Sequence, residues 1–85
     1  MNLEMIGFLK DGKYRLKVLK ELNVKPQLPS ELASKFEINR ASLSRILKVL
    51  KDKELIVSSS NTSRTIIYYI SKKGKNVLEE MEYDS

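Results

Sequence analysis

Residues 39–53 bring together side chains that can bind a phosphate or the edge of a nucleic-acid base. Within NRASLSRILKVLKDK, Arg45 can donate two parallel hydrogen bonds to O6 and N7 of guanine, whereas Lys48 is better suited to a phosphate or a base edge. Small side chains at the start of the segment would let its backbone approach the floor of a groove. The candidate DNA-binding residues of this segment are Asn39, Arg40, Ala41, Ser42, Ser44, Arg45 and Lys48.

An amphipathic helix would position these side chains. Apolar residues recur at the i, i+3, i+4, i+7 spacing of one helical face, at Leu43, Ile46, Leu47 and Leu50. Arg45 and Lys48 fall on the opposite face. Arg40 lies at the edge of the apolar face near the helix start, where a phosphate contact suits it better than a base contact. The alternative is a solvated surface helix without a partner.

Charge and composition favour a polyanionic partner and exclude several kinds of catalytic or metal site. The chain has 16 Lys and Arg against 11 Asp and Glu, a net charge of +5, and residues 39–53, with five basic and one acidic residue, carry +4 of it. Cys and His are absent, which removes disulfides, thiolate metal sites and the usual nucleophile and base pairs. The early apolar run at residues 5–9 is too short for a signal peptide or a membrane span. We therefore expect a cytoplasmic protein that is not an enzyme, with no metal, cofactor or membrane association.

The first half of the chain predicts three helices before residue 39. A short helix over residues 3–9 precedes a second one that begins after a capping Asp11 and ends before Asn23. Pro29 suits the first position of a third helix. Residues 37–39 then form a turn, with Asn39 as the N-cap of the next helix. Two short helices joined so tightly predict a helix-turn-helix over about residues 29–53.

After residue 53 the apolar period changes from 3.6 to 2, which predicts a β-hairpin. Strands at residues 55–57 and 66–70 flank a polar loop, SSSNTSR, at residues 58–64, whose candidate DNA contacts are Asn61, Thr62 and Arg64. Tyr68 and Tyr69 are adjacent in a strand and face opposite sides, so we interpret them as packing residues rather than a base-stacking platform. A last helix over about residues 72–82 follows the capping residue Ser71.

The chain resembles the winged-helix repressors of the MarR and ArsR type, particularly the small archaeal ones. The resemblance is carried by LPSELASKFEINRASLSRILKVLKDKELI and, after it, IIYYISKKGKNVLEEM. The resemblance implies an α+β, mostly helical fold in residues 1–85: a single winged helix-turn-helix domain with a two-stranded hairpin wing at about residues 55–70. Members of the family commonly have Gly where Glu54 stands, so we expect the end of this helix to close without a left-handed residue. The Cys and His ligands of the metal-sensing branch are absent, and metal-triggered release does not carry over.

Both ends of the chain carry more apolar residues than one small core requires. The terminal helices of MarR and ArsR proteins form the dimer, so the resemblance implies a dimer interface at Leu3, Ile6, Phe8, Leu9, Val77, Leu78 and Met81. Packing of both ends within one chain is the alternative. Binding to paired half-sites would give so small a protein a higher affinity, and it would recognise a longer DNA sequence.

These features predict a sequence-specific regulator of transcription that binds double-stranded DNA as a homodimer, on a pseudo-palindromic site. Residues 39–53 would enter the major groove, and residues 58–64 would lie near the adjacent backbone or minor groove. Phosphates would supply most of the affinity, and Arg45 with its small polar neighbours would supply sequence choice. The alternative is a winged-helix module that binds protein within a larger assembly. RNA binding is a third reading.

Overall fold

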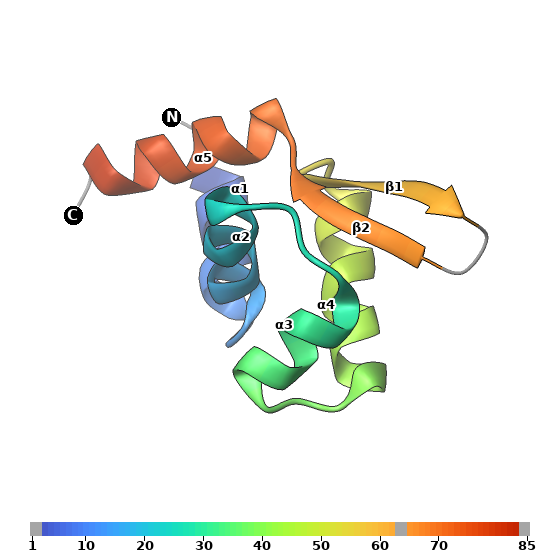
Figure 1. Cartoon of the computed structure of the whole chain (residues 1–85). Coiled ribbons are helices and arrows are strands. Elements are labelled where there is room, and N and C mark those ends of the chain that lie inside the picture. The colour runs from blue at the N-terminus through green and yellow to red at the C-terminus, as the bar shows by residue number, and fades with distance from the viewer. Residues whose placement is uncertain (1–2, 63–64, 84–85) are drawn as a thin grey trace.

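The computed structural model describes residues 3–62 and 65–83, and within them five helices and one two-stranded antiparallel sheet. In chain order the elements are α1 (Leu3–Asp11), α2 (Arg15–Val24), α3 (Pro29–Phe36), α4 (Arg40–Asp52), β1 (Ile56–Thr62), β2 (Thr65–Ile70) and α5 (Lys72–Tyr83). α5 lies across one end of the molecule, and the end of α3 and the start of α4 lie at the other (Figure 1). The hairpin projects sideways from the helices. This arrangement confirms the mostly helical winged helix-turn-helix fold.

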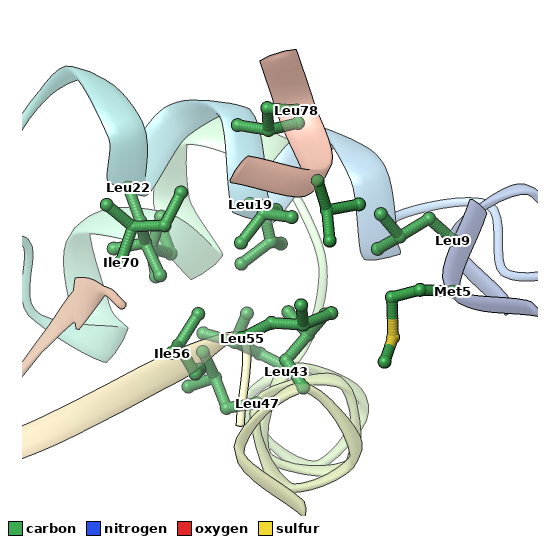
Figure 2. Close-up of a cluster of buried hydrophobic side chains, with 14 of the residues drawn as sticks. Met5, Leu9, Leu19, Leu22, Leu43, Leu47, Leu55, Ile56, Ile70 and Leu78 are labelled. Carbon is green, nitrogen blue, oxygen red and sulfur yellow. The ribbon is translucent and has the colours of Figure 1, made fainter. Parts of the chain in front are cut away.

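All five helices and both strands contribute to one hydrophobic core (Figure 2). Nine side chains in it are less than 2% exposed, namely Leu9, Val18, Leu19, Leu22, Leu32, Leu43, Leu50, Leu55 and Ile56. Leu55 and Ile56 enter the core directly after α4 and fix the base of the hairpin against the helices. The apolar faces predicted for the helices and for the hairpin therefore meet in one place.

The junction between α1 and α2 differs from the prediction. Asp11 is the last residue of α1, and the N-cap position of α2 belongs to Tyr14, which makes no side-chain capping hydrogen bond. The predicted Asp11 cap is therefore wrong, and α2 also continues to Val24 rather than ending before Asn23. Arg15 stabilises the junction instead, because its Nη1 donates a hydrogen bond to the Phe8 carbonyl oxygen at 2.9 Å.

The helix-turn-helix begins and ends as the local signals predict. Pro29 occupies the first turn of α3, and the Glu31 carboxylate accepts a hydrogen bond from the Leu28 backbone amide at 3.0 Å. Asn39 caps α4, since its Oδ1 accepts a hydrogen bond from the Ser42 amide at 2.7 Å. Between the helices, Glu37 adopts a left-handed conformation with a φ of 53°. The chain can thus reverse direction within residues 37–39.

The end of α4 closes through a left-handed residue, contrary to the prediction. Glu54 has a φ of 62°. Its amide donates to the Lys51 carbonyl at 2.9 Å, and the Leu55 amide donates to the Leu50 carbonyl at 3.0 Å. This is the paired hydrogen bonding of a Schellman motif, in which glycine usually occupies the left-handed position. Glu54 adopts that conformation itself, because the turn delivers Leu55 into the core.

The wing contains more strand than the sequence predicts. Residues 58–62 continue β1, with Ser58 opposite Tyr68 and Ser59 opposite Ile67, so the predicted polar loop at residues 58–64 is wrong over most of its length. The register shifts between Ser60 and Thr62. The serines form a strand because β2 supplies the hydrogen-bonding partners, which local composition does not reveal.

The sheet is joined to the helices on both sides. Gln27, between α2 and α3, pairs with Tyr68. The Gln27 amide donates to the Tyr68 carbonyl oxygen at 3.0 Å, and the Tyr68 amide donates to the Gln27 carbonyl oxygen at 2.9 Å. Ser71 caps α5 as predicted, because its Oγ accepts from the Gly74 amide at 3.0 Å. The same hydroxyl donates to the Glu54 carbonyl at 2.7 Å. The wing, α4 and α5 are therefore held together at one junction.

Candidate nucleic-acid interface

α4 separates an apolar buried face from a polar exposed face, as the sequence predicts. Leu43, Leu47 and Leu50 are at most 3% exposed. The side chains proposed to bind DNA are all exposed, namely Asn39, Arg40, Ala41, Ser42, Ser44, Arg45 and Lys48. Arg45 and Lys48 lie on the face opposite the leucines, and the structure thus leaves all seven candidates of this segment accessible to a ligand.

The start of α4 carries the smallest side chains of that surface. Ala41, Ser42 and Ser44 lie within the first five residues of the helix. Asn39 fixes the start by capping it, and this use of Oδ1 leaves the Asn39 amide nitrogen as the group available to a ligand. A helix of ordinary diameter fits a major groove about 12 Å wide, and small side chains permit close approach.

The basic side chains of the exposed face have no acidic partner within the described part of the chain. The ion pair that the structure records there is elsewhere, between Lys35 Nζ and Glu21 Oε1 at 2.9 Å. Arg40, Arg45 and Lys48 therefore keep their charge available for an anion in solution. Charge of one sign on a convex surface attracts a polyanion over roughly a Debye length.

Lys51 has a role that the sequence analysis did not predict. Its Nζ donates a hydrogen bond to the Ser58 hydroxyl at 2.8 Å, which joins the last turn of α4 to β1. The contact depends on the packing of a helix against a strand, and no spacing within either element signals it. Lys51 is thus occupied by the wing, whereas Arg45 and Lys48 point into solvent.

The predicted wing contacts are described only in part. Asn61 and Thr62 belong to β1, but the placement of their side chains lies outside what the structure describes, and so does the whole of Arg64. Tyr68 packs against the core, and Tyr69 is 39% exposed. The two rings belong to adjacent strand residues that face opposite sides of the sheet, which agrees with a packing role for Tyr68.

The apolar residues predicted to form a dimer occupy different environments. Ile6, Leu9, Val77 and Leu78 are at most 8% exposed and belong to the chain's own core. Phe8 and Met81 are partly buried against that core, and Leu3 is 72% exposed. Leu3 stands at the start of α1, which packs against α5. Most of the apolar surface at this end is therefore already covered within one chain.

Among residues 3–62 and 65–83, no three His, Cys, Asp or Glu side chains group closely enough to hold a metal ion. Within the same residues, every helix is too short or too polar to cross a membrane.

Comparison with known proteins identifies the same architecture. Residues 12–58 match the family model of the bacterial regulatory protein, arsR family. A ZitR variant from Lactococcus lactis is similar with a TM-score of 0.77 and 26% identity, over 85% of this chain and 51% of that one. Wild-type ZitR in complex with DNA is similar with a TM-score of 0.70 and 28% identity, over 78% of this chain and 47% of that one.

A second regulator is similar to the same extent. The transcriptional regulator BldR from Sulfolobus solfataricus has a TM-score of 0.75 and 26% identity, over 88% of this chain and 56% of that one. The chain thus spans about half the length of these neighbours. No curated protein sequence matches it.

Proposed function

Because the chain belongs to the arsR family of bacterial regulatory proteins, we propose that two copies of it bind a pseudo-palindromic site in double-stranded DNA and thereby regulate transcription. In each copy α4 enters the major groove, and the wing lies near the adjacent backbone or minor groove. The exposed basic face of α4, opposite its buried leucines, is the observation that carries the proposal. The DNA bound in the ZitR structure supports it.

The side chains on α4 divide between base reading and phosphate binding. Arg45 presents a planar guanidinium that matches the two acceptors on the major-groove edge of guanine. Lys48 and Arg40 bind phosphates, which position the protein but carry no sequence information directly. Ser42 and Ser44 add neutral hydrogen bonds, and Ala41 leaves room for the groove floor. Sequence choice therefore depends chiefly on Arg45.

Two charge-removing substitutions on the same face test this division. Arg45→Ala should cost about 1–3 kcal/mol on a site selected from random DNA and flatten discrimination at one base pair per half-site. Lys48→Ala should weaken binding to all sequences alike, with a smaller salt dependence. Fluorescence anisotropy on selected and scrambled duplexes measures both effects. Lys20→Ala is the matched control, because Lys20 is an exposed lysine on α2.

The outcome separates DNA recognition from its alternative. If Arg45→Ala binds the selected and the scrambled duplex with the same affinity ratio as the wild type, Arg45 does not read a base. If the wild-type protein binds no duplex with a steep negative salt slope, the proposal fails as a whole, and a protein-binding module becomes the better account.

The dimer is proposed to join the start of α1 and the α5 end of each copy, away from the start of α4. Leu3→Glu places a charge on the most accessible apolar residue there without disturbing the core, because Leu3 is 72% exposed. The variant should sediment at 9.8 kDa, whereas the wild type should sediment at twice that mass. Val24→Glu is the matched control, since Val24 is 74% exposed on α2. A wild-type protein that stays at 9.8 kDa at micromolar concentration would refute the dimer.

The wing carries one permanent charge in residues 58–64, at Arg64. Arg64→Ala should reduce the magnitude of the negative slope of log affinity against log salt by about 0.9 per half-site, the share of one phosphate. Base preference in the major groove should not change, because α4 still sets it. If the slope stays the same, the wing stands clear of DNA and α4 is the reader by itself.

A further inference from the structure

Two lysines outside the helix-turn-helix share one aromatic ring. Lys13 Nζ and Lys17 Nζ each lie 5.5 Å from the centroid of the Tyr14 ring, at the start of α2. An ammonium group is attracted to the face of such a ring by its quadrupole, which restrains an otherwise flexible side chain. Both lysines are exposed, and neither has an acidic partner in the part of the chain that the structure describes. The ring therefore holds two solvent-facing charges close together.

The same ring connects these lysines to the end of the helix-turn-helix that faces DNA in our proposal. The Tyr14 and Phe36 rings pack at 6.2 Å between centroids, with 53° between their planes. Phe36 ends α3, and Arg40 begins α4 four residues later, so their Cα atoms are at most about 15 Å apart. Figure 1 shows the α1–α2 connection, the end of α3 and the start of α4 at the same end of the molecule.

The neighbouring cation Arg15 has a structural role, whereas Lys13 and Lys17 do not. Arg15 is used within the fold, because its guanidinium lies 4.3 Å from the Phe8 ring centroid and bonds the Phe8 carbonyl. Lys13 and Lys17 make no such bond, and their two nitrogens are at most about 11 Å apart, since each lies 5.5 Å from one centroid. The phosphates of one DNA strand follow one another in a closely spaced row, so two cations within that span can each bind a different phosphate.

We propose that Lys13 and Lys17, held on Tyr14, form a second phosphate-binding surface that contacts the DNA backbone beside the groove entered by α4. The inference rests on the proposed function and adds to it a contact made at the start of α2 and just before it, outside the helix-turn-helix and the wing. Two like charges on one ring repel each other, and a neighbouring polyanion relieves that repulsion. The surface binds phosphodiester groups of any sequence, so it adds affinity and register but no base preference.

The salt dependence of DNA binding tests the contact. The double variant Lys13→Ala, Lys17→Ala should reduce the magnitude of the negative slope of log affinity against log salt by about 1.8 per bound protomer, two phosphates at about 0.9 each. Between 50 and 200 mM salt its affinity per protomer should then fall about 12-fold less than that of the wild type. The ratio of selected to scrambled affinity should stay the same. The double variant Lys72→Ala, Lys73→Ala is the control, because these exposed lysines lie on α5 at the opposite end.

Neutral phosphate analogues locate the contact on DNA. Single methylphosphonate substitutions at some positions of the duplex should weaken binding by the wild type but not by the Lys13→Ala, Lys17→Ala variant. The variant no longer makes the contact that such a substitution removes. A slope equal to that of the wild type, or a variant that responds to every neutralised position as the wild type does, overturns the inference. If Arg45→Ala behaves as proposed in the same experiments, only this contact is wrong. A wild-type protein without affinity for duplex DNA overturns the proposed function itself.

Discussion

Replacing Glu54 by glycine should stabilise the protein. Glu54 closes α4 with a φ of 62°, where the Cβ of an L-residue approaches backbone atoms and costs roughly 1–2 kcal/mol. Its carboxylate also stands at the negative end of the helix dipole, which costs about 0.3–1 kcal/mol. Glycine removes both penalties and keeps the amide that bonds the Lys51 carbonyl at 2.9 Å.

The gain is reduced by the greater freedom of glycine in the unfolded chain, which costs about 0.5–1 kcal/mol. The net stabilisation of Glu54→Gly should therefore be about 1 kcal/mol. In a domain of this size, that corresponds to a rise in Tm of about 4–8 °C. Urea unfolding should show a higher midpoint with the same m-value, because the surface exposed on unfolding does not change.

Two controls separate the backbone effect from the charge effect. Glu54→Gln removes the carboxylate but keeps the left-handed strain, so it should recover only a few tenths of a kcal/mol. Lys53→Gly lies one residue earlier at a φ of −86°, where glycine brings no relief, and it should destabilise the protein. All variants are compared at one protein concentration, because dimer formation would shift Tm. If Glu54→Gly is no more stable than Glu54→Gln, the strain argument is wrong.

Substitutions at three other positions have outcomes set by single contacts, each measured by urea unfolding. Gly74→Ala should destabilise the protein by about 1–3 kcal/mol, because its Cβ would collide with the Leu55 carbonyl oxygen; wild-type stability would show that α5 can shift away. Asn39→Ala should cost about 1 kcal/mol by removing the cap of α4, and Asn39→Asp should retain most of the stability. The hydrogen bond from Lys35 lowers the pKa of Glu21 in the folded protein below its usual 4.5. The contribution of this ion pair to the free energy of unfolding is therefore complete above pH 4.5, and it is lost as the pH falls through the lower pKa of the folded state. Glu21→Gln should lose this part of the acid sensitivity, and an unchanged pH profile would count against the pair.

The parts of the fold that were predicted correctly depend on local signals. Pro29 can begin a helix but cannot lie inside one, and Asn39 caps the helix that follows it, so the sequence signals the starts of both α3 and α4. The strand at residues 58–62 has no such signal, because its serines pair with β2 across the hairpin. The left-handed conformation of Glu54 was not predicted for a related reason. It is set by tertiary packing, because Leu55 has to reach the core.

The candidate site could be predicted where it lies on one helix and not where it joins several. The 3.6-residue period assigns Arg45 and Lys48 to the exposed face of α4, and the structure agrees. The pairing of Lys51 with Ser58 depends on packing between α4 and β1. The placement of Lys13 and Lys17 beside the helix-turn-helix likewise depends on contact between Tyr14 and Phe36, which belong to different helices.

The burial of the terminal helices decides how the proposed dimer has to be tested. Deleting residues 1–9 would remove Leu9, which has no exposed surface, and replacing Leu78 by Glu would bury a charge at a site that is 6% exposed. The deletion removes part of the core, and an unpaired charge in the core costs far more than the few kcal/mol of net stability. Either change should therefore unfold the protomer. Loss of DNA binding in such variants would follow from unfolding whether or not the protein dimerises. Leu3→Glu avoids this ambiguity because its side chain contributes little to the core, so a folded monomer with weak DNA binding would identify the dimer interface directly.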